Sequence, residues 1–213
     1  MMGIAFHSER APNASKAFSG AAHWRLRGNL GASRHERRVA AIAGKLFDLL
    51  HDQHGMSQKY RHLLAVAALL HDAAKVYGSE LHELRGAQMM LEDRSLPLSP
   101  RERRGIAYLI RYHRGAVPES LEDQSILLAG DKHRKLRILL GFLRAADALD
   151  SRKVRPRTIM IRRGWRKLRI CCIVSEELTE ARRRLGGRGK FELLAEELGL
   201  EVKLRIEREI QFS

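Results

Sequence analysis

Residues 63–75 read LLAVAALLHDAAK. The eight apolar residues that open this stretch predict a mostly interior helix, part of a longer helix over residues 57–75. His71 and Asp72 follow directly, in what would be its last turn. Burying an imidazole and a carboxyl group costs free energy unless each is hydrogen-bonded or bound to a metal ion. The stretch therefore predicts a helical core with chemically active groups at the end of one helix.

Four other segments carry apolar residues three and four positions apart, as a helix with one buried face does. These segments are residues 33–53, 81–92, 99–113 and 135–150. In the third of them, Ser99 and Glu102 predict a capping box, and Pro100 suits the first helical position. Together the five helices predict a bundle.

The pattern changes to a period of two after Val154, which is typical of strands. Two alternating segments, residues 158–163 and 167–174, predict a hairpin with its turn over residues 163–166. Helical residues follow as far as Leu198, and a third alternating segment runs over residues 200–207. We expect an antiparallel sheet that is covered on one face by helix.

The fold class that these patterns predict is mainly α, a helical bundle followed by a small α+β unit of β-β-α-β order. We divide the chain into an N-terminal extension or extra helix (1–30), a helical domain (31–153) and a small α+β domain with a basic hairpin (154–213).

Basic residues are concentrated in the α+β unit. The 213-residue chain has a formal net charge of +15, and residues 155–190 hold 12 Lys and Arg against 3 Glu, a local net charge of +9. A charge excess of this kind attracts phosphorylated substrates, polyphosphate or nucleic acid, although a solvated surface without a partner is the alternative. The residues that we predict to bind a polyanion are Arg162, Arg163, Arg166 and Lys167.

The composition favours a cytoplasmic protein. No apolar run approaches the roughly 18 to 20 residues that a membrane-spanning helix needs, so we expect no membrane partner. Cys171 and Cys172 are adjacent, where ordinary disulfide geometry is not available, so nothing points to an oxidising compartment. We expect a mature N-terminus. An organelle transit peptide stays open, because residues 1–35 are rich in Ala, Ser and Arg with Glu9 as the only acid.

Several helix faces that should be apolar carry groups able to bind metal. A single histidine on such a face is more often a satisfied core residue than a ligand. A set on successive helices points the other way, because helices packed around one core bring their inner faces together. Imidazole with carboxylate suits Mn, Fe, Ni or Zn, or Mg if waters complete the shell. A purely structural metal or a buried polar network is the alternative. The set consists of His35, His71, Asp72, His113 and Asp147.

The order of these residues resembles the HD domain of metal-dependent phosphohydrolases. More narrowly, residues 35–39 (HERRV), 68–72 (ALLHD) and 110–114 (IRYHR) resemble the C-terminal half of the exopolyphosphatase and guanosine pentaphosphate phosphohydrolase family. The likeness runs from about residue 30 to residue 210. In that family an actin-like catalytic half comes first, so we expect this chain to be a free-standing version.

The resemblance implies two sets of ligands. One metal ion would be held by His35, His71, Asp72 and Asp147. His82 and His113 match positions that bind a second ion in binuclear relatives. Ala73-Ala74 and Arg85 depart from the family pattern, which leaves the second ion open, along with a surface role for His82.

Metal-activated water attacking a phosphorus atom is the reaction that such a site predicts. Its substrate would be a nucleotide, an alarmone-like pyrophosphate or another phosphate ester, although activity could have been lost. We assign catalytic roles to Asp72, Lys75 and Arg144. The cations that we expect to bind phosphate are Lys75, Arg111, Arg114 and Arg144. The alternative function is a non-catalytic module that binds polyphosphate or nucleic acid, and a homodimer contact through the small sheet stays open.

Overall fold

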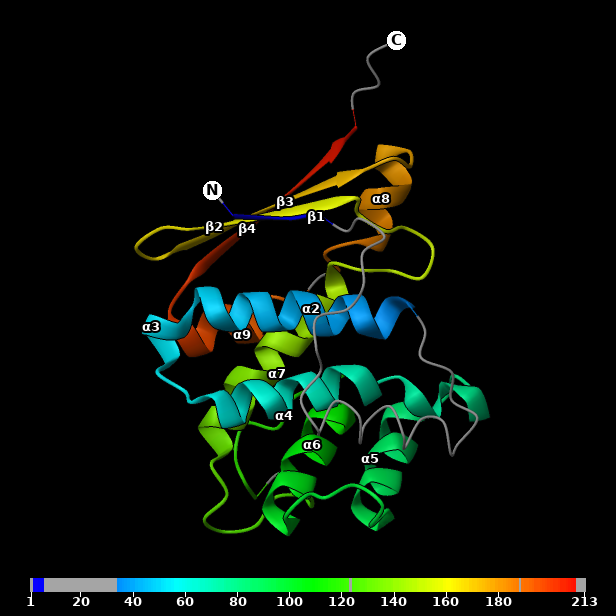
Figure 1. Ribbon diagram of the computed structural model, residues 1–213, viewed down its shortest axis with the longest axis vertical. Coiled ribbons are helices and arrows are strands. Elements are labelled where there is room, and N and C mark those ends of the chain that lie inside the picture. The colour runs from blue at the N-terminus through cyan, green and yellow to red at the C-terminus, as the bar shows by residue number, and fades with distance from the viewer. Residues whose placement is uncertain (1, 6–33, 123, 188, 210–213) are drawn as a thin grey trace.

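The computed structural model describes residues 2–5, 34–122, 124–187 and 189–209, with a helical layer at one end of the molecule and a sheet at the other (Figure 1). Most of the segment 1–30 lies outside the described residues, so the extra helix and the transit peptide are not tested there. Residues 2–5 form a strand. The helical layer contains α2 (Arg34–Leu49), α3 (His51–His54), α4 (Gln58–Leu70), the 3-10 helix η1 (Ala73–Tyr77), α5 (His82–Glu92), α6 (Pro100–Tyr112) and α7 (His133–Ala148).

Helix α4 lies at the centre of this layer. Every residue from Leu63 to Leu70 is buried, as the apolar run predicts, and α2, α6 and α7 all pack against α4. Helix α5 packs against α6 and η1 at the side. None of the described helices has both the length and the apolar character that crossing a bilayer requires.

The predicted helix over residues 57–75 is shorter than expected. The helix ends at Leu70, although His71 still has helical dihedral angles. Asp72 is no longer helical, with φ −103° and ψ 7°. The chain then turns through η1. The predicted capping box of α6 is confirmed, since the Ser99 side chain accepts from Glu102 N and Ser99 N donates to Glu102 Oε2 at 2.9 Å.

The sheet has the strand order β1-β2-β3-β4. Strands β2 (Thr158–Arg163) and β3 (Lys167–Val174) form the predicted antiparallel hairpin, and β1 (Met2–Ala5) pairs antiparallel with β2. Strand β4 (Glu201–Arg208) is parallel to β3, so the prediction of a wholly antiparallel sheet was wrong. Helices α8 (Leu178–Arg184) and α9 (Glu192–Leu198) return the chain to the end of the sheet where β3 began, as a parallel connection requires.

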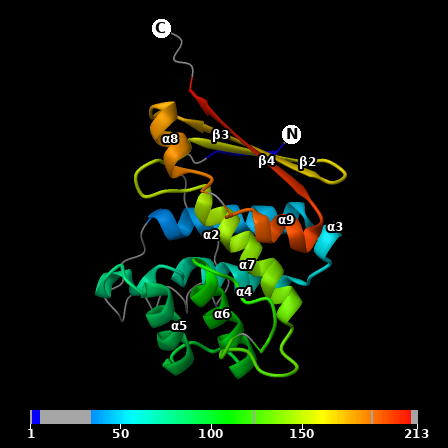
Figure 2. The ribbon, with the colours of Figure 1, turned by 180° about the vertical axis from the view of Figure 1, so that it is seen from behind.

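The inner face of the sheet joins the helical layer in one continuous core that includes Ile159, Ile170 and Cys172. Helix α9 lies alongside α7 beneath the sheet (Figure 2). Gly141 of α7 makes this possible, because a Cβ atom there would lie 2.9 Å from Leu194 Cα of α9. The predicted fold class, mainly α with a small α+β unit, is confirmed. The division into domains stays a prediction.

Candidate metal centre

Five helix ends bring the predicted ligands to one place. The ligand positions are His35 in the first turn of α2, His71 and Asp72 after α4, His82 at the start of α5, His113 after α6 and Asp147 near the end of α7. All four histidines and Asp72 are buried. Because His82 is fully buried, it is not the surface histidine that the sequence left open as an alternative. Because helix ends leave peptide groups unsatisfied, side chains there have backbone partners within reach.

Four of the side chains form a first group. His35 Nε2 lies 3.4 Å from Asp147 Oδ1, and His71 Nε2 lies 3.7 Å from the same oxygen. Asp72 Oδ2 is 3.8 Å from His35 Nε2 and 3.7 Å from His71 Nε2. Ligand atoms held about 2.1 Å from one tetrahedral ion lie about 3.4 Å apart. The first group therefore has the spacing of a metal site.

A second group surrounds the other oxygen of Asp72. Asp72 Oδ1 lies 3.1 Å from His82 Nε2 and 3.5 Å from His113 Nε2. The rings of His82 and His113 meet edge to face, with centroids 5.3 Å apart. The carboxylate of Asp72 thus stands between the two groups, with one oxygen facing each.

Backbone carbonyls fix the tautomers of three histidines. The Nδ1 atoms of His71, His82 and His113 lie 2.8, 2.9 and 2.7 Å from the carbonyl oxygens three residues earlier. A carbonyl oxygen only accepts, so each Nδ1 carries the proton and each Nε2 is left with a lone pair, the form in which histidine binds metal.

Asp150 orients the fourth histidine. Its Oδ2 lies 2.8 Å from His35 Nδ1, and its Oδ1 accepts from Arg38 Nε at 2.5 Å. Metal-bound histidines commonly donate their second N–H to a carboxylate in this way. The sequence analysis assigned no role to Asp150. Its position three residues after Asp147 places it one helical turn from a predicted ligand, which could have indicated a role in the site.

Four buried polar atoms in the centre have no hydrogen-bond partner. They are the Nε2 atoms of His71, His82 and His113, together with Asp72 Oδ1. Buried polar groups are nearly always satisfied, so four orphaned lone pairs in one place require an explanation. Divalent cations provide it, because imidazole and carboxylate are their ordinary ligands. The residues present fit a metal site.

The charge states of the two carboxyl groups and of His113 also suit metal binding, whereas His35 must first lose a proton. Burial would raise the pKa of Asp72 and of Asp147, but neighbouring histidines, His71 among them, hold the pKa of both carboxyl groups well below the usual range. Burial lowers the pKa of His113 to about 4. Burial also opposes the charge on His35, yet Asp147 and Asp150 outweigh it and raise the pKa of His35 to about 9. At pH 7 both carboxylates are therefore ionised and His113 is neutral, as ligands must be.

Three cations border the two carboxylates. Lys75 Nζ lies 2.5 Å from Asp72 Oδ2, and Arg152 Nη2 lies 3.1 Å from the same oxygen. Lys190 Nζ lies 2.9 Å from Asp147 Oδ2. Of these three cations, the sequence analysis predicted only Lys75 as a phosphate-binding residue. Lys190 enters from the segment between α8 and α9, and no motif in the sequence signals it.

The other predicted phosphate-binding residues make different contacts. Arg144 Nη1 donates to the carbonyl oxygens of Tyr112 at 3.1 Å and Gly115 at 2.9 Å, and Arg111 lies over the Tyr112 ring. Arg114 is exposed. Within residues 34–122, 124–187 and 189–209, no hydrogen bond or ion pair joins these three arginines to a ligand side chain. Their roles stay predictions.

A helical bundle whose helix ends gather histidines around a shared aspartate defines a class of metal-dependent hydrolases. The family model of the HD domain matches residues 33–152, more than half of the chain. The chain belongs to the HD-domain family, whose members bind divalent metals and are generally hydrolases, and the predicted superfamily is confirmed. A search of curated proteins finds no significant match.

Proposed function

We propose that this chain is a phosphohydrolase that cleaves a nucleotide, an alarmone-like pyrophosphate or a related phosphate ester. The observation that carries the proposal is the convergence of four imidazole Nε2 atoms and two carboxylates, with the two oxygens of Asp72 divided between two ligand groups. A structural metal site would normally be closed and rich in cysteine. Cys171 and Cys172, on β3, are not among the ligands.

Two ions fit these groups. His35, His71, Asp72 and Asp147 would hold one, and Asp72, His82 and His113 would hold the other. Bound there, divalent ions would lower the pKa of a coordinated water and neutralise phosphoryl oxygens. The imidazole-rich second group favours Mn, Fe, Ni or Zn over Mg.

The chain's own cations would hold the phosphate. In the structure Lys75, Arg152 and Lys190 neutralise the Asp72 and Asp147 carboxylates. Lys75 and Lys190 are half-buried, so each ammonium group interacts more strongly with an anion than it would in bulk water. We assign them to phosphate oxygens, with Asp72 orienting the attacking water.

The resemblance to the C-terminal half of exopolyphosphatases and guanosine pentaphosphate phosphohydrolases supports a phosphoanhydride substrate. Three cations around one centre suit a substrate with several phosphate charges better than a simple monoester. We therefore rank nucleotides and alarmone-like pyrophosphates first.

The test joins metal content to turnover. The purified protein is loaded with Mn²⁺ or Zn²⁺, its metal content is measured by elemental analysis, and hydrolysis is followed on a panel of nucleotides and pyrophosphates. His71→Ala should lose both metal and turnover. His62→Ala, which changes a half-buried histidine on α4, the helix that His71 follows, should keep both. A protein that takes up no metal, or a His71→Ala variant that still turns over, would refute the proposal.

A further inference from the structure

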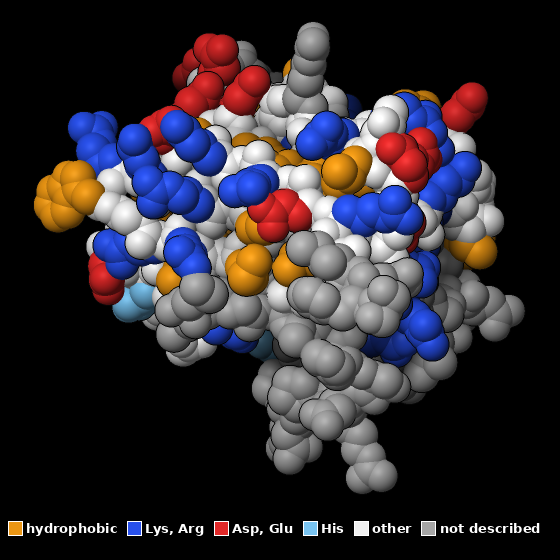
Figure 3. Space-filling model, turned by 90° about the horizontal axis from the view of Figure 1, so that it is seen from above, with side chains coloured by type: hydrophobic (Ala, Val, Ile, Leu, Met, Phe, Trp, Pro, Cys, Tyr) orange, Lys and Arg blue, Asp and Glu red, His pale blue; other side chains and the backbone are white. Residues whose placement is uncertain are grey.

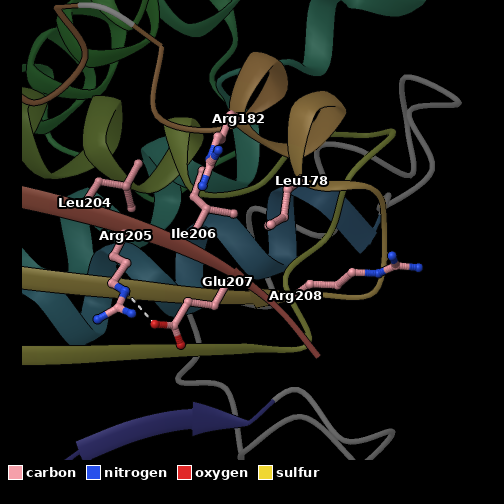
Figure 4. A pocket seen from close by; sticks show the side chains of 7 residues that line it. All are labelled: Leu178, Arg182, Leu204, Arg205, Ile206, Glu207 and Arg208. Atoms are coloured by element: carbon pink, nitrogen blue, oxygen red, sulfur yellow. Dashed lines mark ion pairs between the residues drawn. The ribbon is translucent and has the colours of Figure 1, made fainter. Parts of the chain in front are cut away.

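The two faces of the sheet differ in chemistry. On β4, Leu204 and Ile206 point toward α8, while Arg205 and Glu207 point to the opposite side, where they form an ion pair (Figure 4). The same alternation continues through β2 and β3, whose inner residues are buried. The outer face of the sheet, which no described helix covers, is therefore charged toward the hairpin turn and carries the half-buried Met160, Cys171 and Ile173 farther along. Figure 3, which looks down on this end of the molecule, shows several Lys and Arg side chains there, together with acidic and hydrophobic side chains.

A basic row crosses this outer face. Arg162 of β2 lies opposite Arg169 of β3, and Arg169 lies opposite Lys203 of β4. All three side chains are exposed. Neighbouring strands are about 4.8 Å apart, and like charges directly opposite one another destabilise a sheet. The arrangement therefore costs the folded protein stability unless an anion neutralises it.

The row is largely free of acidic partners. Lys203 Nζ lies 3.0 Å from Glu201 Oε1, whereas neither Arg162 nor Arg169 makes an ion pair or side-chain hydrogen bond within the part of the chain that the structure describes. Other predicted polyanion-binding residues are engaged. Arg163 Nη1 lies 2.7 Å from Asp52 Oδ2 of α3. Arg166 Nε donates to the Gly199 carbonyl oxygen at 3.4 Å, and Lys167 Nζ lies 3.3 Å from Glu201 Oε2.

An exposed tryptophan stands at the end of the hairpin. Trp165 lies in the turn between β2 and β3, and 92% of its surface is exposed. At this exposure the Trp165 ring adds nothing to the core, and it is the most exposed of the large hydrophobic side chains in the described residues. Proteins that bind single-stranded nucleic acid combine a basic surface that follows the backbone with aromatic side chains on which bases stack.

We propose that the outer face of β2, β3 and β4 binds a single-stranded nucleic acid, with backbone phosphates on the basic row (Arg162, Arg169 and Lys203) and a base stacked on Trp165. Inorganic polyphosphate would be attracted by the same charges but has no base to stack. The tryptophan therefore favours nucleic acid. The proposal is independent of the metal centre, because none of these residues contacts a candidate ligand.

Fluorescence anisotropy of a labelled oligothymidylate titrated with the full chain tests the proposal across a salt series. The double variant Arg162→Glu, Arg169→Glu should bind more weakly. A plot of log K against log salt concentration should become less steep, by about 0.7 for each phosphate contact removed. Trp165→Ala should weaken binding by about 5- to 150-fold.

The matched control is Arg94→Glu, Lys132→Glu, which makes the same charge change at exposed positions of the helical layer. It should bind as the unchanged protein does, and circular dichroism should show all variants folded. Equal loss in the control would overturn the proposal in favour of unspecific charge attraction. Unchanged binding in Trp165→Ala, together with full displacement by inorganic polyphosphate, would overturn it in favour of a polyphosphate surface.

Discussion

Replacing Asp150 by asparagine tests the metal centre without touching a ligand. In the structure one carboxylate oxygen accepts from His35 Nδ1 and the other from Arg38 Nε. Asparagine keeps the shape but has only one accepting oxygen, so His35 and Arg38 would compete for it. The imidazole of His35 would lose its fixed orientation and part of its basicity.

The size of the expected loss in metal affinity comes from metalloproteins in which a carboxylate orients a metal-bound histidine, as Asp150 orients His35. Removing a group that orients a metal-bound histidine costs about 10- to 100-fold in affinity, or about 1.4 to 2.7 kcal/mol. A second effect opposes it, because losing the carboxylate also lowers the pKa of His35 from about 9 and so weakens proton competition at neutral pH. The difference from the unchanged protein should therefore be smaller at pH 7 than at pH 8.5.

Isothermal titration with Mn²⁺ at both pH values measures the effect. Asp52→Asn is the control, since Asp52 also pairs with an arginine but is exposed and distant from the ligands. The second ligand group does not contain His35, so one Mn²⁺ should still bind the variant with unchanged affinity. If Asp150→Asn folds and binds both ions as tightly as the unchanged protein at pH 8.5, the assignment of His35 as a ligand is refuted.

Three further outcomes are expected. Metal binding at pH 7 should release a proton from His35, because its pKa is about 9 in the metal-free protein. Titrations in buffers of different ionisation enthalpy would show it, and identical heats would contradict it. Lys190→Met should raise KM for the substrate about 10-fold or more while leaving metal content unchanged, as steady-state kinetics and elemental analysis would show. A KM equal to that of the unchanged protein would remove Lys190 from the phosphate site. Gly141→Ala should destabilise the fold by about 1 to 3 kcal/mol, because the new Cβ atom would lie 2.9 Å from Leu194 Cα. Urea denaturation measures this, and an unchanged midpoint would show that α9 moves aside without cost.

The helices and the hairpin could be predicted because their signals are local. Periodic apolar residues, the Ser99 capping box and the turn before Lys167 each depend on a few neighbouring residues. Alternation in β4 is the same for parallel and antiparallel pairing, so the sequence could not show which way that strand runs. The end of α4 at Leu70 was missed because the apolar period gives no sign of the turn at Asp72.

The candidate site divides in the same way. The spacing of His35, His71-Asp72 and Asp147 carries a recognisable order, whereas His82 depends on the packing of α5 against α6. Lys190 reaches Asp147 across 43 residues of chain, and such a contact is set by the tertiary fold alone.

The segment between β3 and β4, which contains α8 and α9, contributes contacts to the helical layer and so limits where the chain can be divided into fragments. The family match ends at residue 152, yet Lys190 and the α9 backbone against Gly141 come from beyond it. A fragment that ends at that border would expose the apolar flank of α7 and lose one of the cations beside the candidate metal ligands. We therefore expect the fragment that corresponds to the family match to be less stable than the whole chain and to bind an anionic ligand more weakly.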